Sequence, residues 1–169
     1  MIPHPQYYPN DKNQYNDIAL LRLESEVQYS DFIKPICLPF ESKIKGSLYV
    51  KEILEVAGWA KTEKQSSSST KLKSQVEGMA NDQCNQAYRN EQRQINSNTQ
   101  ICAGKAKEFK CRSDLGGPLM KINYEGSPPY YYVAGIMSSD PSLCETTGKP
   151  AIFTHVGNYL DWIQATIKP

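Results

Sequence analysis

Five cysteines are the residues of this sequence with the most evident chemistry, because a thiol can bind a metal or form a disulfide. They lie at positions 37, 84, 102, 111 and 144, and no pair has the C-x-x-C spacing typical of zinc sites. Since the only histidines are His4 and His155, we expect no metal site and no other cofactor. Disulfides fit better and indicate an oxidising compartment. The odd count predicts that one thiol pairs outside the chain.

Asp17 is a candidate for acid–base chemistry, because it directly precedes an apolar run that ends at Leu23. An aspartate in this position usually begins a strand or caps a turn, so the residue alone does not identify an active site. A histidine would be the natural partner of such a carboxylate. However, His4 lies in a proline-rich start and His155 directly precedes the final helix. We expect surface or capping roles for both.

The elements that would position these residues are mostly strands and turns. Eleven prolines, ten glycines and eleven tyrosines, with short apolar runs between them, predict an all-β fold with little helix. We expect a core strand that begins near Asp17 and is buried on both faces at its start. A segment broken by prolines over 33–39 should run along a surface, and a strand should cover 48–56. A hairpin with mostly packed aromatics is expected over 124–132.

Two helices are expected in addition to the strands. Asn81 and Asp82 can cap a short helix that presents Cys84. Near the end of the chain, apolar residues recur with helical spacing and predict a helix docked on the body. Those residues are Val156, Tyr159, Leu160, Ile163 and Ile167.

Length and charge narrow the function classes. The 169 residues fit one domain. Nineteen basic and 18 acidic residues give a formal charge of +1, which provides no field for nucleic acid or an anionic membrane. The first five residues lack the regions of a signal peptide, and no apolar run reaches membrane-spanning length. Composition therefore identifies no partner.

The segment 111–119 reads Cys-Arg-Ser-Asp-Leu-Gly-Gly-Pro-Leu. It closely resembles the nucleophile segment of trypsin-like serine proteases, Cys-x-Gly-Asp-Ser-Gly-Gly-Pro-Leu, with two departures. The context of Cys37 and the stretch 58–84 most resemble the insect clip-domain branch. Five further segments agree with the family in order and spacing, so that the resemblance covers essentially the whole chain: Asn16–Leu21, Pro35–Pro39, Ala57–Trp59, Ile101–Gly104 and Tyr159–Ile163.

The resemblance implies a trypsin-like double six-stranded β-barrel with a short intermediate helix and a C-terminal helix. The N-terminal barrel would be incomplete. Residues 1–169 would then form a partial serine protease domain, with the segment that carries the catalytic histidine upstream of Met1.

The family's reaction requires a serine that attacks the peptide carbonyl, a histidine that takes its proton and an aspartate that orients the histidine. By resemblance Asp17 is a vestigial triad acid, and Leu115 replaces the nucleophilic serine. Loss of the nucleophile in a comparable triad lowers turnover roughly 10⁶-fold. Ser113 replaces a glycine next to the oxyanion hole, and its side chain is expected to hinder that conformation. Asp114 matches the activation-pocket acid, a buried carboxylate that would need other donors here.

The positions that select substrates have also changed, according to the same resemblance. Phe109 stands where an acidic residue selects basic substrates. The family's Ser-Trp-Gly wall is replaced by Ser138, Ser139 and Asp140, and a glycine near the pocket is replaced by Ala151.

The cysteines acquire partners by the same resemblance. The implied disulfides are Cys84–Cys102 and Cys111–Cys144. Cys37 remains for an N-terminal light chain or clip-type domain.

These observations favour a secreted, extracellular, non-catalytic serine protease homologue. It would bind a protease, zymogen or inhibitor and modulate a proteolytic cascade, and the clip-domain branch implies innate immunity. Two alternatives stay open. One is an active trypsin-family endopeptidase, either with Ser113 as nucleophile or with serine as the true residue at position 115. The other is a fragment without independent function. Separately, Leu115 could be an ordinary core leucine, which agrees with an inactive site.

Overall fold

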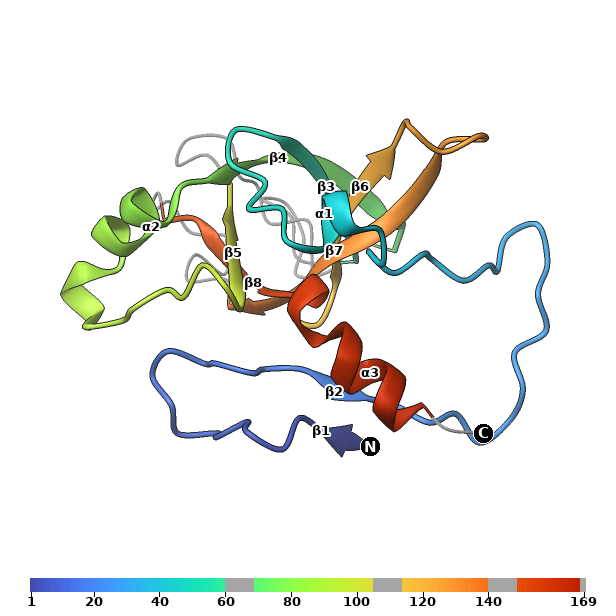
Figure 1. Ribbon diagram of the computed structural model, residues 1–169, viewed down its shortest axis with the longest axis horizontal. Coiled ribbons are helices and arrows are strands. Elements are labelled where there is room, and N and C mark those ends of the chain that lie inside the picture. Colours follow the sequence, from blue (N-terminus) through green and yellow to red (C-terminus); the bar gives the residue numbers. More distant parts are fainter. Residues whose placement is uncertain (60–68, 105–113, 140–148, 168–169) are drawn as a thin grey trace.

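The computed structural model describes residues 1–59, 69–104, 114–139 and 149–167. Its main body is a closed antiparallel barrel of six strands in the order β3-β4-β5-β8-β7-β6 (Figure 1). The strands are β3 (Ile53–Gly58), β4 (Leu72–Met79), β5 (Gln100–Ala103), β6 (Pro118–Asn123), β7 (Tyr130–Ser139) and β8 (Ala151–His155).

Alternating side chains of these strands fill the barrel. In β3 the pattern places Leu54 and Val56 inside with no exposed surface, as expected for a strand with one face on the core. They pack in one cluster with Leu119 of β6 and Phe153 of β8. This packed interior fixes the positions of β7 and β8, the two strands that contact the candidate site.

Strand β3 starts five residues later than the sequence predicts. Tyr49 and Lys51 have φ angles of +53° and +61°, in the left-handed region that interrupts strand pairing. Gly78 of β4 packs against this turn so closely that a Cβ there would lie 1.9 Å from the Tyr49 carbonyl oxygen. Only glycine fits at this position, and the expected strand over 48–52 is therefore a turn.

The hairpin expected over 124–132 is present as the connection from β6 to β7. Its tyrosines divide between the two faces, because successive side chains in a strand point to opposite sides. Tyr132 is buried, whereas Tyr131 is 38% exposed and Tyr124, at the tip, is 76% exposed. The expectation that most of these aromatics pack is therefore only partly right.

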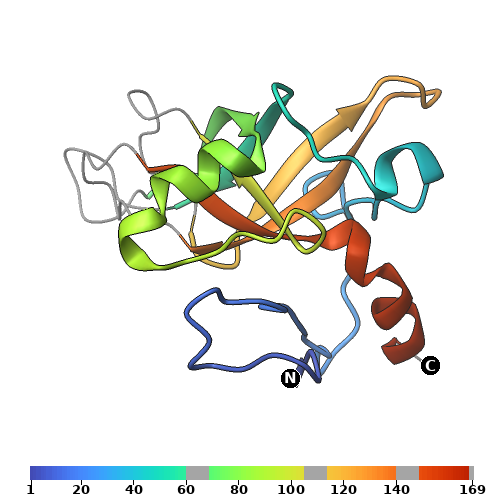
Figure 2. The same ribbon diagram turned by 60° about the vertical axis from the view of Figure 1, so that its left-hand side comes forward.

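The N-terminal segment lies against the barrel and α3 as a two-stranded ladder of β1 (Ile2–Pro3) and β2 (Ala19–Leu20) (Figures 1 and 2). Ile18 is buried, but Leu21 and Leu23 are 69% and 61% exposed. The predicted burial on both faces is wrong beyond Ile18, because β2 pairs only with β1 among the described residues.

The helices are α1 (Ser42–Lys45), α2 (Asn81–Ala87) and α3 (Leu160–Thr166), with 3-10 turns η1 (Arg89–Glu91) and η2 (Val156–Tyr159). Helix α2 presents Cys84 to the interior as predicted, but its N-cap is Ala80, without a side-chain hydrogen bond. Asn81 instead donates from Nδ2 to the Ile95 carbonyl, at 2.9 Å.

Helix α3 docks through Tyr159, Leu160 and Ile163, which are buried against Ile18. Ile167 is 56% exposed because the helix ends before it. In the part of the chain that the structure describes, no helix is long and apolar enough to cross a membrane.

Candidate active site

Asp17 is held by two barrel strands, although it lies in the N-terminal segment. Ser138 of β7 donates from Oγ to Asp17 Oδ2 at 2.7 Å. Thr154 of β8 donates from Oγ1 to the Asp17 carbonyl, also at 2.7 Å. Both the side chain and the backbone of Asp17 are therefore fixed, in a half-buried position where a hydrogen bond to a charged oxygen is strong.

Leu115 lies at the tip of a tight turn over 114–117. The Gly117 N–H donates to the Asp114 carbonyl at 2.7 Å, and Gly116 has a φ of +80°, the left-handed angle that this kind of turn requires at its third residue. The Leu115 side chain is 64% exposed. Leu115 is therefore not a core leucine, contrary to the structural alternative raised from the sequence.

Backbone hydrogen bonds bring this turn to the same stretch of β7 that contacts Asp17. The Gly116 N–H donates to the Met137 carbonyl at 2.8 Å, and the Met137 N–H donates to the Gly117 carbonyl at 2.9 Å. Met137 is followed directly by Ser138, the partner of Asp17. The structure thus brings Asp17 and Leu115 together around the end of one strand.

Asp114 is exposed, so the buried carboxylate expected from the sequence is wrong. Its Oδ2 accepts a hydrogen bond from the Trp59 N–H at 2.8 Å. A carboxyl group in an exposed position needs no buried cation beside it.

Arg93 belongs to the same region but was missed by sequence reasoning. Its Nη1 donates to Ser139 Oγ at 2.9 Å, and its Nη2 donates to Gln14 Oε1 at 2.6 Å. Burial lowers the pKa of the guanidinium below its usual value. Arg93 therefore connects β7 with the segment that carries Asp17. No motif marks it, since its partners lie far away in the sequence.

The two histidines do not complete a catalytic pair. His155 is only 1% exposed, with its ring 5.9 Å from that of Tyr49, and burial lowers its pKa. A surface role is wrong, because β8 carries His155 into the interior. His155 does occupy the N-cap position of η2, but without a side-chain capping hydrogen bond. His4 packs edge-on against Tyr159 at 5.2 Å, and its pKa is also lowered by burial. Among the described residues, neither imidazole is a hydrogen-bond partner of Asp17.

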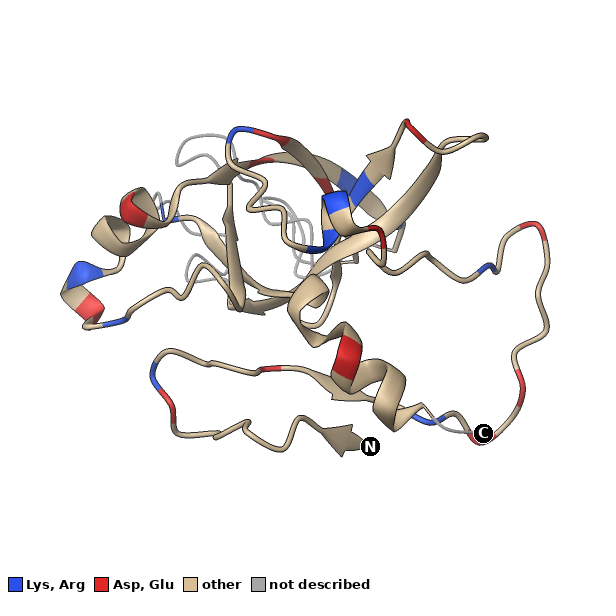
Figure 3. Ribbon diagram, viewed as in Figure 1, with Lys and Arg blue, Asp and Glu red and all other residues tan. Residues whose placement is uncertain are grey.

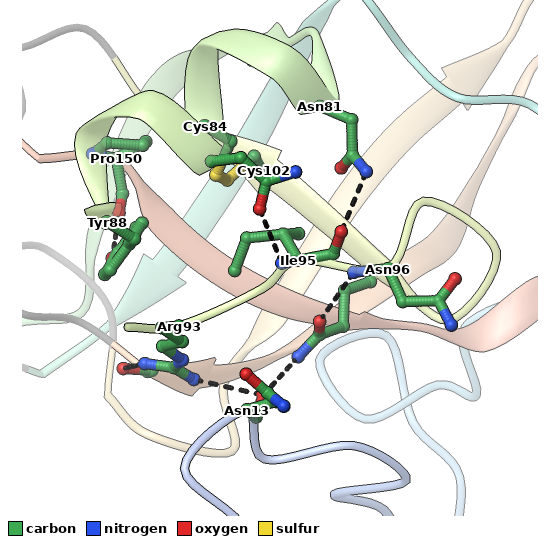
Figure 4. The surroundings of a disulfide bond; sticks show 12 residues. Asn13, Asn81, Cys84, Tyr88, Arg93, Ile95, Asn96, Cys102 and Pro150 are labelled. Atoms are coloured by element: carbon green, nitrogen blue, oxygen red, sulfur yellow. Dashed lines mark hydrogen bonds between the residues drawn. A yellow bond between two sulfur atoms is a disulfide. The ribbon is translucent and has the colours of Figure 1, made fainter. Parts of the chain in front are cut away.

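A disulfide between Cys84 and Cys102 ties α2 to β5, with Cα atoms 6.3 Å apart (Figure 4). Cys37 is exposed and carries a free thiol. Within the ranges described, no three His, Cys, Asp or Glu side chains gather as metal ligands.

Among the substrate-selecting positions, Ala151 is buried in β8 opposite Ala103. The remaining candidate positions lie outside the described residues: Phe109, Ser113, Asp140 and the pair Cys111–Cys144.

The closed six-stranded barrel, with Asp17 and the 114–117 turn both hydrogen-bonded to the end of β7, agrees with the trypsin-like fold that the sequence motifs predict. The family model for trypsin matches residues 1–163. The chain belongs to the trypsin family, whose members include serine endopeptidases, and the resemblance inferred from its motifs is confirmed.

The relatives are insect clip-domain serine proteases and similar enzymes. Serine protease ea of Drosophila melanogaster is 46% identical over 168 residues, which are 99% of this chain and 43% of that protein. CLIP domain-containing serine protease HP8 of Bombyx mori is 43% identical, over 99% of this chain and 45% of that protein. The crystal structure of the Drosophila Grass clip serine protease of the Toll pathway superposes with a TM-score of 0.84 at 32% identity, over 98% of this chain and 46% of that one. The chain thus spans less than half the length of these relatives.

Proposed function

We propose that this chain is a non-catalytic serine protease homologue that regulates a proteolytic cascade by binding other proteins. The observation that carries the proposal is Leu115, at the position where the family's segment has its nucleophilic serine. A leucine side chain has no group that a base could activate, so the covalent step of the family's reaction has no attacking atom.

The neighbourhood of Leu115 supports the same conclusion. Asp17 keeps its partner Ser138, so the framework that orients a base is intact. His155, however, is enclosed in the barrel beside Tyr49, and His4 packs against Tyr159. Both imidazoles are thus engaged elsewhere, so neither is a substitute for the histidine that the resemblance places upstream of Met1.

The altered cleft extends the proposal to the positions around the site. We assign Asp17 as a vestigial triad acid and Asp114 as the former activation-pocket acid, now bonded to the Trp59 amide. The altered positions Phe109, Ser113, Ser139 and Asp140, next to the retained Ser138, would form a recognition surface in place of a substrate pocket. Ala151 is buried and would shape this surface only from beneath.

We also propose a disulfide between Cys111 and Cys144. Cys37 would link to an N-terminal light chain or clip-type domain, which agrees with its exposed thiol. Residues 1–169 would then be part of a larger extracellular protease-like unit.

The names of several relatives indicate the kind of cascade. They include Melanization protease 1 and the Spaetzle-processing enzyme of Drosophila melanogaster, and Phenoloxidase-activating factor 1 of Holotrichia diomphalia. We propose that this chain acts in an insect innate-immune cascade of that type, with a protease, a zymogen or an inhibitor as partner.

Two assays on the same preparation test the proposal. Fluorogenic peptides with arginine, lysine, phenylalanine or alanine before the scissile bond should not be hydrolysed above the buffer rate. Added to an active clip-domain protease and its protein substrate, the chain should change the rate of cleavage in proportion to its concentration. Hydrolysis of any peptide would refute the inactive state.

The alternative of an active endopeptidase has one candidate nucleophile in the chain, Ser113. If hydrolysis is seen, Ser113→Ala should abolish it. Activity that survives this substitution would instead indicate a contaminating protease.

A further inference from the structure

A cavity of about 720 Å³ lies beside α2 and η1, on the side where the N-terminal segment crosses the loop that follows η1. Its walls are almost entirely polar, they contain two arginines, and no aspartate or glutamate lines them. The lining residues are Tyr15, Asn81, Asn85, Arg89, Gln92, Arg93, Gln94, Ile95, Asn96 and Ser97. We call this cavity the arginine pocket.

Arg93 brings a half-buried positive charge to the arginine pocket, and the carboxylates of Glu91, Asp11 and Asp17 act on this charge only from a distance. Its hydrogen bonds go to neutral oxygens, those of Ser139, Gln14 and the Asn13 carbonyl, and its Nε–H is buried without a partner. Among the described residues, no carboxylate forms an ion pair with it. Burial already lowers the pKa of this guanidinium. A half-buried cation in this state gains from an anion that reaches it.

Arg89 provides the second charge. Its side chain has no ion pair with any described residue, whereas Glu91, two residues along η1, is paired with Lys149. Glu91 is therefore occupied elsewhere, and among the described residues no side chain engages Arg89. Arg93 already donates from both terminal nitrogens to neutral oxygens, which a carboxylate would supplement or replace. Over the rest of the molecule, charges of both signs are interspersed (Figure 3).

The rest of the wall suits a peptide backbone. Asn85 uses its side-chain oxygen to accept the Ile95 N–H at 2.7 Å, which leaves its NH₂ group as a free donor among the described residues. Tyr15 donates to the Gln94 carbonyl at 2.9 Å, and Arg93 bonds to the Asn13 carbonyl (Figure 4), so two contacts tie the N-terminal segment to this wall. Amide side chains of this kind can pair with both the N–H and C=O groups of an extended chain.

We propose that the arginine pocket binds an extended segment of a polypeptide partner through a glutamate or aspartate side chain. The inference rests on the proposed function, because it identifies the kind of partner that a non-catalytic homologue would hold. Arg93 also bonds to Ser139, the neighbour of Ser138, so one wall of the pocket lies beside the residue that holds Asp17. Two forked guanidinium groups favour a carboxylate held in a defined orientation.

The test is fluorescence anisotropy with the fluorescein-labelled peptide Gly-Ala-Glu-Glu-Ala-Gly and its Gln-Gln counterpart. The glutamate peptide should bind at least about tenfold more tightly, and less tightly as salt rises. Arg93→Gln and Arg89→Gln should each weaken its binding by about three- to tenfold. The control Lys43→Gln, which removes an exposed lysine paired with Glu125 on another face, should change it less than about twofold.

Equal binding of the two peptides, or unchanged binding by both arginine variants, would overturn the proposal. So would tight, arginine-dependent binding of a heparin decasaccharide without binding of the glutamate peptide, since the pocket would then be a glycan site. If Arg93→Gln does not fold, as judged by circular dichroism, the exposed Arg89→Gln still decides the outcome. Peptide hydrolysis measured on the same sample distinguishes the two ideas: turnover refutes the proposed function, whereas absent binding in an inactive chain refutes only the pocket.

Discussion

Replacing Leu115 by serine tests whether the missing hydroxyl is the only defect of the site. The Leu115 side chain is 64% exposed, so only about a third of it is covered by protein. Full burial of a leucine side chain contributes about 1.5–3 kcal/mol, and a third of that is about 0.5–1 kcal/mol. The turn itself is held by backbone hydrogen bonds that the substitution leaves in place. Leu115→Ser should therefore fold like the parent chain.

The restored hydroxyl should nevertheless remain unreactive. A serine is a weak nucleophile at its ordinary pKa unless a base takes its proton, and neither His4 nor His155 contacts Asp17. We expect that Leu115→Ser, expressed as the 169-residue chain, is not labelled by a fluorescent fluorophosphonate. The assay is scored by in-gel fluorescence against an active trypsin at equal concentration, with Leu115→Ala as the matched control of similar exposure.

Stoichiometric labelling of Leu115→Ser, with none of Leu115→Ala, would refute this reasoning. It would show that a base and oxyanion donors are already assembled around the turn. Leu115 alone would then explain the loss of activity, and the changes at the surrounding substrate-selecting positions would not contribute to it.

Three further predictions concern stability. Ser138→Ala should lower the free energy of unfolding by about 1–2 kcal/mol, because it removes the donor to half-buried Asp17 and water only partly replaces it; an unchanged urea midpoint would contradict the role of this hydrogen bond. Replacing both Cys84 and Cys102 by alanine should lower the free energy of unfolding by about 3 kcal/mol, because the disulfide closes a loop between cysteines that are 18 residues apart. A decrease below about 1 kcal/mol would contradict this loop-closure argument. The folded-state pKa of His155 is lowered from 6.5, so its neutral form contributes stability that is complete above that pH and is lost as the pH falls through the folded-state pKa. In urea denaturation, the free energy of unfolding should fall below about pH 6.5, with a slope of at most about 1.4 kcal/mol per pH unit from this group. The free energy of unfolding of His155→Gln should depend less steeply on pH. An equal slope in the two proteins would exclude His155 as the cause.

The elements that carry family motifs could be predicted from the sequence, because those motifs fix both local structure and role. The barrel, the position of Asp17 before a strand and the cysteine pair of α2 and β5 follow from short segments. Even the turn around Leu115 is marked by its two glycines. In each case the information lies within a few neighbouring residues.

The rest depends on contacts between distant parts of the chain. Arg93 reaches Gln14, 79 residues away, and no local pattern distinguishes it from a surface arginine. His155 is buried because β8 pairs with both β5 and β7, a consequence of topology. The late start of β3 follows from the left-handed backbone at Tyr49 and its contact with Gly78. Periodicity cannot detect any of these three features.

The most direct test of the central claim is the intact mass of the unmodified chain after incubation with excess diisopropyl fluorophosphate, followed by peptide mapping. The account predicts the mass of the unreacted chain, with an active trypsin in the same tube fully converted. A phosphorylated adduct on any serine of this chain, Ser113 above all, would contradict it and show that the site is a working protease.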